Sequence, residues 1–181
     1  WKTFSEFLNE AKKRKTSLAG TGGHSVLNVH LMETGLGIKF NFVPYASSAE
    51  GFTAVAGKHV EAVITYSSTP MPMIRAGKLR ALATLSSMRD PILPEVPNFK
   101  ELGYGDIPLL PAYGLFAAPP ETPKEIVAIL EKAVSKAITN PEFNKMAENV
   151  GIALGFTTSS DLNKLVLDHY ELLNKYKEFV K

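Results

Sequence analysis

The sequence has no cysteine among its 181 residues. This absence excludes disulfide bonds and cysteine-ligated metal sites, and it leaves the redox state of the compartment open. A clear excess of one charge is also missing, because 20 lysines and arginines face 18 aspartates and glutamates, for a net charge of +2. The longest basic run, residues 12–15, lies at the end of a predicted helix, where the helix dipole stabilises positive charge. Composition therefore gives no reason to expect a nucleic-acid partner, and none is predicted.

Long hydrophobic runs are absent as well. The longest apolar stretch, at about residues 109–120, is interrupted by prolines and does not reach the length of a membrane span. No secretory leader is visible, but the chain starts at Trp1, so this absence carries no information. Hydrophobic residues make up 45% and charged residues 21%, proportions typical of a globular protein. A length of 181 residues is enough for one core, or for one domain and part of another.

Motifs that carry catalysis or bind cofactors are incomplete or missing. The glycine-rich stretch 20–25 lacks the third glycine of a dinucleotide-binding fingerprint, and Tyr45 stands where an acidic residue would end the second strand. No Gly-x-Ser-x-Gly nucleophile motif occurs. His24 and His30 are six residues apart, which argues against a zinc pair, and adjacent His24 and Ser25 cannot adopt triad geometry. We therefore predict no enzyme activity, no cofactor and no metal site.

The first 85 residues show an alternation of predicted helices and strands. A capping box at residues 3–6 predicts the first helix, and apolar patterns bounded by glycine and proline predict the strands. Strands joined by short helical connections favour a parallel sheet covered on both faces, so the predicted fold class is α/β. The predicted elements are helix 4–14, strand 16–19, a helix ending near Gly35 or Gly37, strand 38–43, helix 50–56, strand 60–65, helix 70–76 and strand 79–85.

From residue 86 the pattern changes to a proline-rich loop followed mainly by helices. A second capping box at residues 122–125 predicts one of these helices, and we place a domain boundary within 103–112. One strand and three amphipathic helices cannot close a core alone. We therefore expect that part of their supporting sheet lies before Trp1, and that 123–180 exposes apolar surface through which the chain can self-associate. The predicted elements are helix 98–102, strand 109–118, helix 123–138, helix 141–149 and a last helix from Ser159 or Ser160.

The loops after three successive predicted strands carry small and polar residues. In an open α/β sheet these loops meet at the carboxyl ends of the strands, where ligands bind. Backbone amides, hydroxyls and two helix N-termini would favour a small anion such as a carboxylate, and the tyrosines would add an aromatic surface and phenol donors. The alternative is that these are ordinary loops whose serines and threonines cap helices. The candidate ligand-binding residues are Gly20, Thr21, Gly22, Gly23, His24, Ser25, Tyr45, Ser47, Ser48, Thr65, Tyr66 and Ser67.

The chain resembles the later part of the substrate-binding receptors of tripartite tricarboxylate transporters, also called Bug receptors. Each matching motif is short, but their order along the chain is specific. The matching motifs are Ala19-Gly-Thr-Gly-Gly23, Val43-Pro-Tyr45, Ile74-Arg-Ala-Gly-Lys-Leu-Arg-Ala-Leu82, Leu93-Pro-Glu-Val-Pro97, Glu101-Leu-Gly103, Tyr113-Gly-Leu-Phe-Ala-Ala118 and Thr122-Pro-Lys-Glu-Ile-Val127.

The resemblance implies a type II periplasmic-binding-protein fold with two α/β domains. Residues 1–110 would form the complete second domain, and 111–181 would be the C-terminal return into a first domain whose N-terminal part is absent here. It further implies an exported receptor, periplasmic or otherwise extracytoplasmic, with a lipid anchor left open. Such a receptor delivers a small organic anion to a two-subunit membrane permease. The resemblance implies that the loop matching 20–25 contacts a ligand carboxylate and that the loops matching 45–48 and 65–68 complete that side of the site.

The sequence departs from the family pattern in three places. Ser47 and Ser48 replace a glycine pair, Thr65 replaces a common aspartate, and His24 precedes the usual histidine position, which Val26 occupies. Without that aspartate an amino-acid ligand loses a partner for its ammonium group, so a dicarboxylate, tricarboxylate or aromatic acid is favoured. The rival hypotheses are a cytoplasmic α/β enzyme or ligand-sensing regulator, and a chain that binds nothing because half of the cleft is missing.

Overall fold

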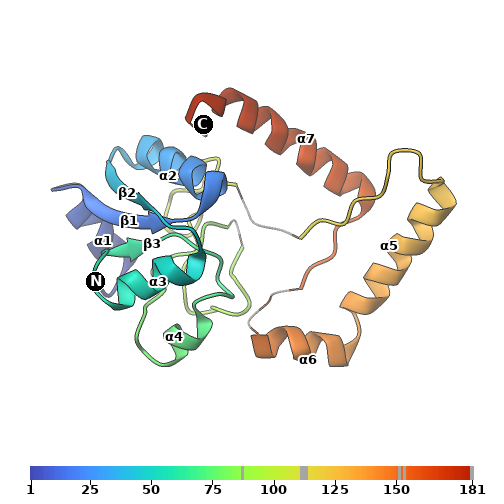
Figure 1. The fold of residues 1–181 in the computed structure, drawn as a ribbon, viewed down its shortest axis with the longest axis horizontal. Helices are drawn as coiled ribbons and strands as arrows, with labels where there is room; N and C mark the ends of the chain where they lie inside the picture. Colours follow the sequence, from blue (N-terminus) through green and yellow to red (C-terminus); the bar gives the residue numbers. More distant parts are fainter. Residues whose placement is uncertain (87, 111–113, 151, 153, 180–181) are drawn as a thin grey trace. The chain divides into compact units, whose positions relative to one another are not determined.

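The computed structural model describes residues 1–86, 88–110, 114–150, 152 and 154–179, and these separate into two compact units. One unit holds the described residues of Trp1–Pro111 together with those of Tyr176–Lys181. The other holds the described residues of Ala112–Lys175. Figure 1 colours the chain from blue to red in sequence order.

The first unit is built around a three-stranded parallel sheet in the order β2-β1-β3. The central strand β1 (Thr16–Gly20) pairs with β2 (Phe40–Pro44) along its whole length, from Thr16 opposite Phe40 to Gly20 opposite Pro44. The third strand, β3 (Ala62–Val63), is much shorter than the predicted strand 60–65 and pairs with Leu18 and Ala19. The predicted parallel sheet is confirmed for these three strands.

Helices cover both faces of this sheet, as expected for parallel strands. On one face Leu18 packs in a cluster with α1 (Phe4–Ala11) and α2 (Gly22–Leu36). On the other face Ala19 packs with Ala54 of α3 (Ser48–Ala56), and α4 (Met71–Arg75) follows β3 along the chain. The side chains of the neighbouring residues Leu18 and Ala19 therefore pack on opposite faces of the sheet, as expected from the period-two alternation of a strand.

The N-terminal capping box is confirmed. The Thr3 hydroxyl accepts a hydrogen bond from the Glu6 amide at 3.2 Å, and Phe4, Phe7, Leu8 and Ala11 are buried. The helix ends at Ala11 rather than at residue 14, so the whole basic run 12–15 follows it, beginning with Lys12 at the C-cap.

Two predicted elements of the first unit are wrong. Residues 79–85 form no strand, and only Thr84 makes an isolated parallel bridge, to Asn98. The bridging segment contains Pro97, which has no N–H to donate, so the pairing cannot extend from Thr84 back through residues 79–83. Asn98 does exchange hydrogen bonds with Glu101, but the predicted helix 98–102 is a single turn that ends at Gly103 with φ of 85°.

The second unit contains α5 (Lys124–Ile138), α6 (Pro141–Val150) and α7 (Ser159–Lys175). The 3₁₀ turn η1 (Lys177–Phe179), which follows α7 in the sequence, belongs to the first unit. The Asn140 Oδ1 atom accepts from the amides of Glu142 and Phe143 and starts α6. The predicted cap at Thr122 is wrong, because Pro123 takes the N-cap position and no side chain bonds there. The predicted strand 109–118 is absent from 109–110 and 114–118, while 111–113 lie outside the described residues.

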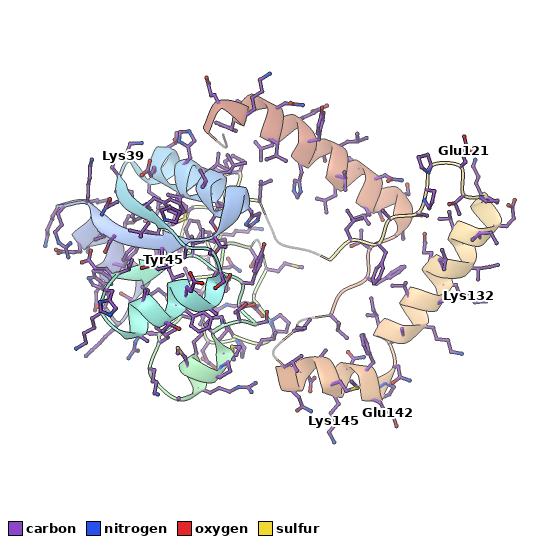
Figure 2. The ribbon with its side chains drawn as sticks, viewed as in Figure 1. Lys39, Tyr45, Glu121, Lys132, Glu142 and Lys145 are labelled. Carbon is purple, nitrogen blue, oxygen red and sulfur yellow. The ribbon has the colours of Figure 1, made fainter. Side chains whose placement is uncertain are left out.

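Apolar side chains remain exposed on all three helices of the second unit, as the amphipathic pattern predicts. Ile129 is 63% exposed, Met146 64% and Leu167 63%. In the same unit, charged residues such as Lys132 and Lys145 are exposed on α5 and α6 (Figure 2). No helix among the described residues is both long and apolar enough to cross a bilayer.

Candidate functional site

The three predicted ligand loops begin at the same end of the sheet. The Tyr45 amide donates to the Gly20 carbonyl at 2.9 Å, and the Ile64 amide donates to the Ala19 carbonyl at 2.9 Å. These bonds continue the strand pairing one residue past β2 and β3, so the loops start at the same level along β1. The structure thus brings the candidate residues of all three loops to the carboxyl ends of the strands (Figure 1).

Gly20 is the residue that lets α2 begin directly above the strand end. A Cβ atom at this position would lie 2.6 Å from Phe42 Cε2 and 2.9 Å from Ser25 Cβ, closer than real side chains approach. The next glycine, Gly22, has φ of 66°, a left-handed conformation that favours glycine. Glycine is therefore required at position 20 because a side chain would clash there, and it is favoured at position 22 because the backbone is left-handed.

The N-terminus of α2 is not capped by a side chain. Thr21 takes the N-cap position but makes no capping hydrogen bond, and the first turn holds no acidic residue. The first amides of a helix have no partner within the helix, and the dipole of this 15-residue helix adds partial positive charge there. The amides of Gly22, Gly23 and His24 are therefore suited to an anionic ligand.

The N-terminus of α3 differs, because its own side chains satisfy it. The Ser47 hydroxyl accepts from the Glu50 amide at 3.2 Å, and Glu50 places negative charge in the first turn. For Ser47 the structure thus shows the capping role that the sequence left open as an alternative. Tyr45 begins this loop and is labelled in Figure 2, beyond the end of β2 opposite Lys39.

The loop after β3 contributes a buried hydroxyl and an exposed ring. The Thr65 Oγ1 atom is buried and has no hydrogen-bond partner among the described residues. The Thr16 Oγ1 atom, at the opposite end of β1, is buried in the same way, so it is the place of Thr65 after β3 that makes its hydroxyl a candidate ligand group. Tyr66 is 50% exposed and its ring lies 5.9 Å from that of His24, at an interplanar angle of 27°.

Two residues that sequence reasoning missed, Asn28 and Leu110, lie next to His24. The His24 Nε2 atom is 3.0 Å from the Leu110 carbonyl oxygen, and the fully buried Asn28 bonds both the N–H and the C=O of Leu110. An asparagine between the apolar residues Leu27 and Val29 was a signal in the sequence. Its partner is 82 residues away, which local patterns cannot reveal.

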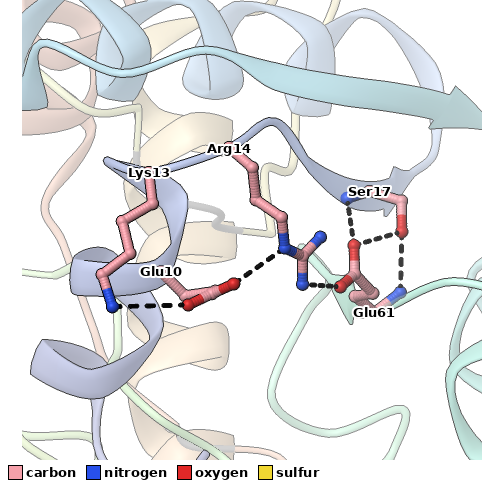
Figure 3. A network of polar contacts seen from close by, with 5 residues as sticks. All are labelled: Glu10, Lys13, Arg14, Ser17 and Glu61. Carbon is pink, nitrogen blue, oxygen red and sulfur yellow. Dashed lines mark hydrogen bonds and ion pairs between the residues drawn. The ribbon is translucent and has the colours of Figure 1, made fainter.

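The opposite end of the sheet holds a network of ion pairs. The Arg14 guanidinium bonds Glu61 at 2.6 Å and Glu10 at 2.8 Å, and Glu61 also accepts from the Ser17 amide and hydroxyl (Figure 3). The hydrogen bond from Arg14 is the main cause that lowers the pKa of Glu61 to about 2. Burial opposes this shift as the next largest effect, and each of the two Ser17 bonds lowers the pKa by a smaller amount. The network ties the end of α1 to the starts of β1 and β3.

A cavity of about 430 Å³ also lies at this end, lined by Lys12, Lys13, Lys15 and Lys39 among others. The lysines around this cavity have a structural explanation. Both α1 and α2 end there, and lysine side chains near a helix C-terminus are stabilised by the partial negative charge of the helix dipole. Lys39 is paired with Glu33 at 2.6 Å. We therefore keep the carboxyl ends of the strands as the candidate site. No cluster of three metal-ligating side chains occurs in the part of the chain that the structure describes.

Solved structures of similar fold define the class of protein. A periplasmic transporter superimposes with a TM-score of 0.78 at 27% identity, covering 98% of this chain and 60% of its own. A TctC solute-binding protein from Polaromonas gives a TM-score of 0.76 at 26% identity, covering 97% and 62%. The fold is therefore that of the periplasmic binding proteins, and the predicted fold class is confirmed.

The sequence identifies the family within that class. The whole of residues 1–181 matches the family model described as the tripartite tricarboxylate transporter family receptor, and the chain belongs to this family. A UPF0065 protein of Cupriavidus necator is 33% identical over 150 residues, which are 80% of this chain and 44% of that protein. The chain thus spans less than half the length of this relative.

Two further structures of the same fold contain carboxylates. A Rhodopseudomonas palustris protein with adipate has a TM-score of 0.74 at 23% identity, and MatC from the same organism, with bound malate, has a TM-score of 0.60 at 24%. At this level of identity they show similarity of fold alone.

Proposed function

We propose that this protein is an extracytoplasmic receptor that binds a small organic carboxylate and delivers it to a two-subunit membrane permease. The observation that carries the proposal is the uncapped N-terminus of α2 at the carboxyl ends of the strands. Membership of a transporter receptor family supports the receptor role, and the adipate and malate in structures of the same fold support the ligand class.

The ligand's carboxylate would accept hydrogen bonds from the amides of Gly22, Gly23 and His24. Thr65 would supply a buried hydroxyl that has no partner among the residues the structure describes, and Tyr66 would supply an exposed ring. The candidate loops hold no lysine or arginine, so the negative charge would be stabilised by amide dipoles rather than by a formal cation. They also lack a carboxylate that could pair with an ammonium group, which favours di- and tricarboxylates or aromatic acids over amino acids.

The wider assignments are part of the same proposal. Residues 1–110 would correspond to one domain of the receptor, and 111–181 to the segment that returns into the other. The family relationship supports a location outside the cytoplasm, which osmotic-shock fractionation of the source cells would test with an antibody against this chain.

A pair of substitutions at Gly23 tests the proposal. Gly23 is exposed in the first turn of α2, so Asp at this position introduces negative charge next to the amides, whereas Asn has nearly the same shape without charge. We expect Gly23→Asp to weaken adipate binding, measured by calorimetry, about tenfold or more relative to Gly23→Asn. Equal affinities for the two variants would show that the anion does not bind at these amides.

A further inference from the structure

A buried asparagine on α2 fixes the backbone of one residue far away in the sequence. Asn28 is fully buried, its Oδ1 atom accepts from the Leu110 amide at 2.8 Å, and its Nδ2 atom donates to the Leu110 carbonyl at 3.1 Å. This pair of bonds satisfies both the N–H and the C=O of Leu110, and breaking it would leave buried polar groups without partners. The position of Leu110 is therefore set by α2.

The Leu110 carbonyl in turn bears on which ring nitrogen of neutral His24 carries the proton. The His24 Nε2 atom lies 3.0 Å from the same carbonyl oxygen, which has two lone pairs and can accept from both side chains. The same Nε2 atom lies 3.3 Å from Asn28 Nδ2, so an unprotonated Nε2 would accept from that amide, but it would also direct its lone pair at the carbonyl oxygen 3.0 Å away, which is repulsive. The shorter contact favours a proton on Nε2 of neutral His24, donated to the Leu110 carbonyl.

His24 also contacts the exposed ring at the candidate site. Its imidazole stacks on Tyr66 with ring centroids 5.9 Å apart and an interplanar angle of 27°. Because the Nε2 proton is used on Leu110, the neutral side chain has no donor left for an anion. The contact with Tyr66 is made through the face of the ring, whose orientation the Leu110 bond holds.

We propose that the His24 side chain is a positioning residue: the Asn28–Leu110 pair orients its imidazole, and the imidazole holds the Tyr66 ring against the anion site. The inference rests on the proposed function for the role of Tyr66 toward a ligand. It assigns the His24 backbone amide to anion binding and its side chain to support. This division differs from a histidine that donates directly to the carboxylate.

The protonation state is tested first, on the full chain without ligand. Two-bond ¹H–¹⁵N correlation spectra distinguish which ring nitrogen of a neutral histidine carries the proton. We expect His24 to show the Nε2–H form. A predominant Nδ1–H form would overturn the inference.

Two variants then separate the ring from the donor. His24→Phe keeps a ring to stack on Tyr66 but loses the hydrogen bond, whereas His24→Gln keeps an N–H donor but loses the ring. The Leu110 amide itself donates to Asn28, so loss of the His24 bond to the Leu110 carbonyl acts on that amide by loosening the Leu110 backbone. Hydrogen exchange at the Leu110 amide should rise about fivefold in His24→Phe, with little change in His24→Gln. The Tyr66 ring resonances should move in His24→Gln and stay in place in His24→Phe.

Exchange at the Ile64 amide, which donates to Ala19 within the sheet, serves as the internal reference for general opening. Rates at Leu110 are compared as ratios to Ile64, so loss of global stability in either variant cancels. An unchanged ratio in His24→Phe, or identical responses of the two variants, would contradict the positioning role.

Adipate affinity supplies a readout that distinguishes positioning from direct donation. A positioning ring predicts that His24→Phe retains most of the affinity and His24→Gln loses about fivefold, whereas a direct donor predicts the reverse order. Failure of adipate to bind the unsubstituted chain would count against the proposed function. The ligand-free spectra and exchange ratios would still decide whether Asn28 and Leu110 orient His24.

Discussion

At the scale of single residues, Glu61 shows how one carboxylate joins three elements. It accepts hydrogen bonds from Arg14, just after α1, and from the amide and hydroxyl of Ser17 in β1, which lie 47 and 44 residues before it in the sequence. The Glu61 side chain is 32% exposed and that of Arg14 49%, so solvent screens part of their attraction. The pKa of Glu61, at about 2, is nevertheless well below its usual value of 4.5.

This pKa predicts a pH dependence of stability. Because the folded carboxyl keeps its charge to lower pH than the unfolded one, the unfolded state binds more protons below pH 4.5. The contribution of Glu61 is therefore complete above about pH 4.5 and is lost as the pH falls towards 2. After allowance for solvent screening, we expect it to be roughly 1–2 kcal/mol.

Urea unfolding at pH 6 and pH 3 tests this expectation. Glu61→Gln should be less stable than the unsubstituted chain at pH 6, and the difference should shrink at pH 3. Glu121→Gln, a change at an exposed carboxylate outside the network, is the matched control. A difference for Glu61→Gln that is equal at both pH values would contradict the pKa shift.

Residue-level reasoning found the candidate loops but not the contacts behind them. The glycines at 20 and 22 and the polar residues after each strand were visible in the sequence because their roles depend on local geometry. The contacts of Asn28 with Leu110 depend on how segments 82 residues apart pack, and no local pattern carries that information. The orphaned Thr65 hydroxyl was named as a candidate, but its burial required the structure.

At the scale of elements, the two helices that follow β1 and β2 have different N-termini. The first hydroxyl before α3 caps it, whereas Thr21 before α2 makes no capping bond. The same residue chemistry, a hydroxyl at the N-cap position, therefore serves stability in one loop and is left unused in the other. This contrast separates a structural loop from a candidate binding loop.

Alanine substitutions at these two caps provide a direct comparison. Ser47→Ala removes the bond to the Glu50 amide and should lower stability by about 1 kcal/mol. Thr21→Ala removes no capping bond and should cost only a few tenths of that. Thermal unfolding followed by circular dichroism measures both, and an equal loss in the two variants would mean that Thr21 caps α2 after all.

Elements were predicted well where one local signal sufficed and poorly where pairing was needed. The capping box at Thr3 and the asparagine before Pro141 each mark a helix start by their own chemistry. The segment 79–85 has the apolar content of a strand, and Leu82, Ala83 and Leu85 do pack on the core. The bridge at Thr84 nevertheless does not extend back through this segment, because Pro97 in the bridging partner has no N–H to donate.

At the scale of the whole molecule, the exposed apolar residues of α5, α6 and α7 have a predictable consequence in solution. Apolar side chains in water favour association, since burying them against another copy removes them from solvent. We expect the chain to self-associate as its concentration rises. Ile129 is 63% exposed on α5 and is a suitable position at which to weaken this contact.

Light scattering over a range of concentrations tests this expectation. Ile129→Glu should lower the apparent mass at high concentration, whereas Lys136→Glu, a charge change at an exposed polar position of the same helix, should lower it less. A constant monomer mass for the unsubstituted chain at all concentrations would contradict the expectation.

The central claim is that amides at the carboxyl ends of the parallel strands bind a small organic carboxylate. The most direct measurement is a ¹H–¹⁵N NMR titration of the chain with adipate, using 1,6-hexanediol as the uncharged counterpart of the same length. The account predicts saturable shifts at the amides of Gly22, Gly23 and His24 and in residues 64–67, with none on addition of the diol. No shifts with adipate, or shifts confined to the basic residues 12–15 at the opposite end of the sheet, would contradict it.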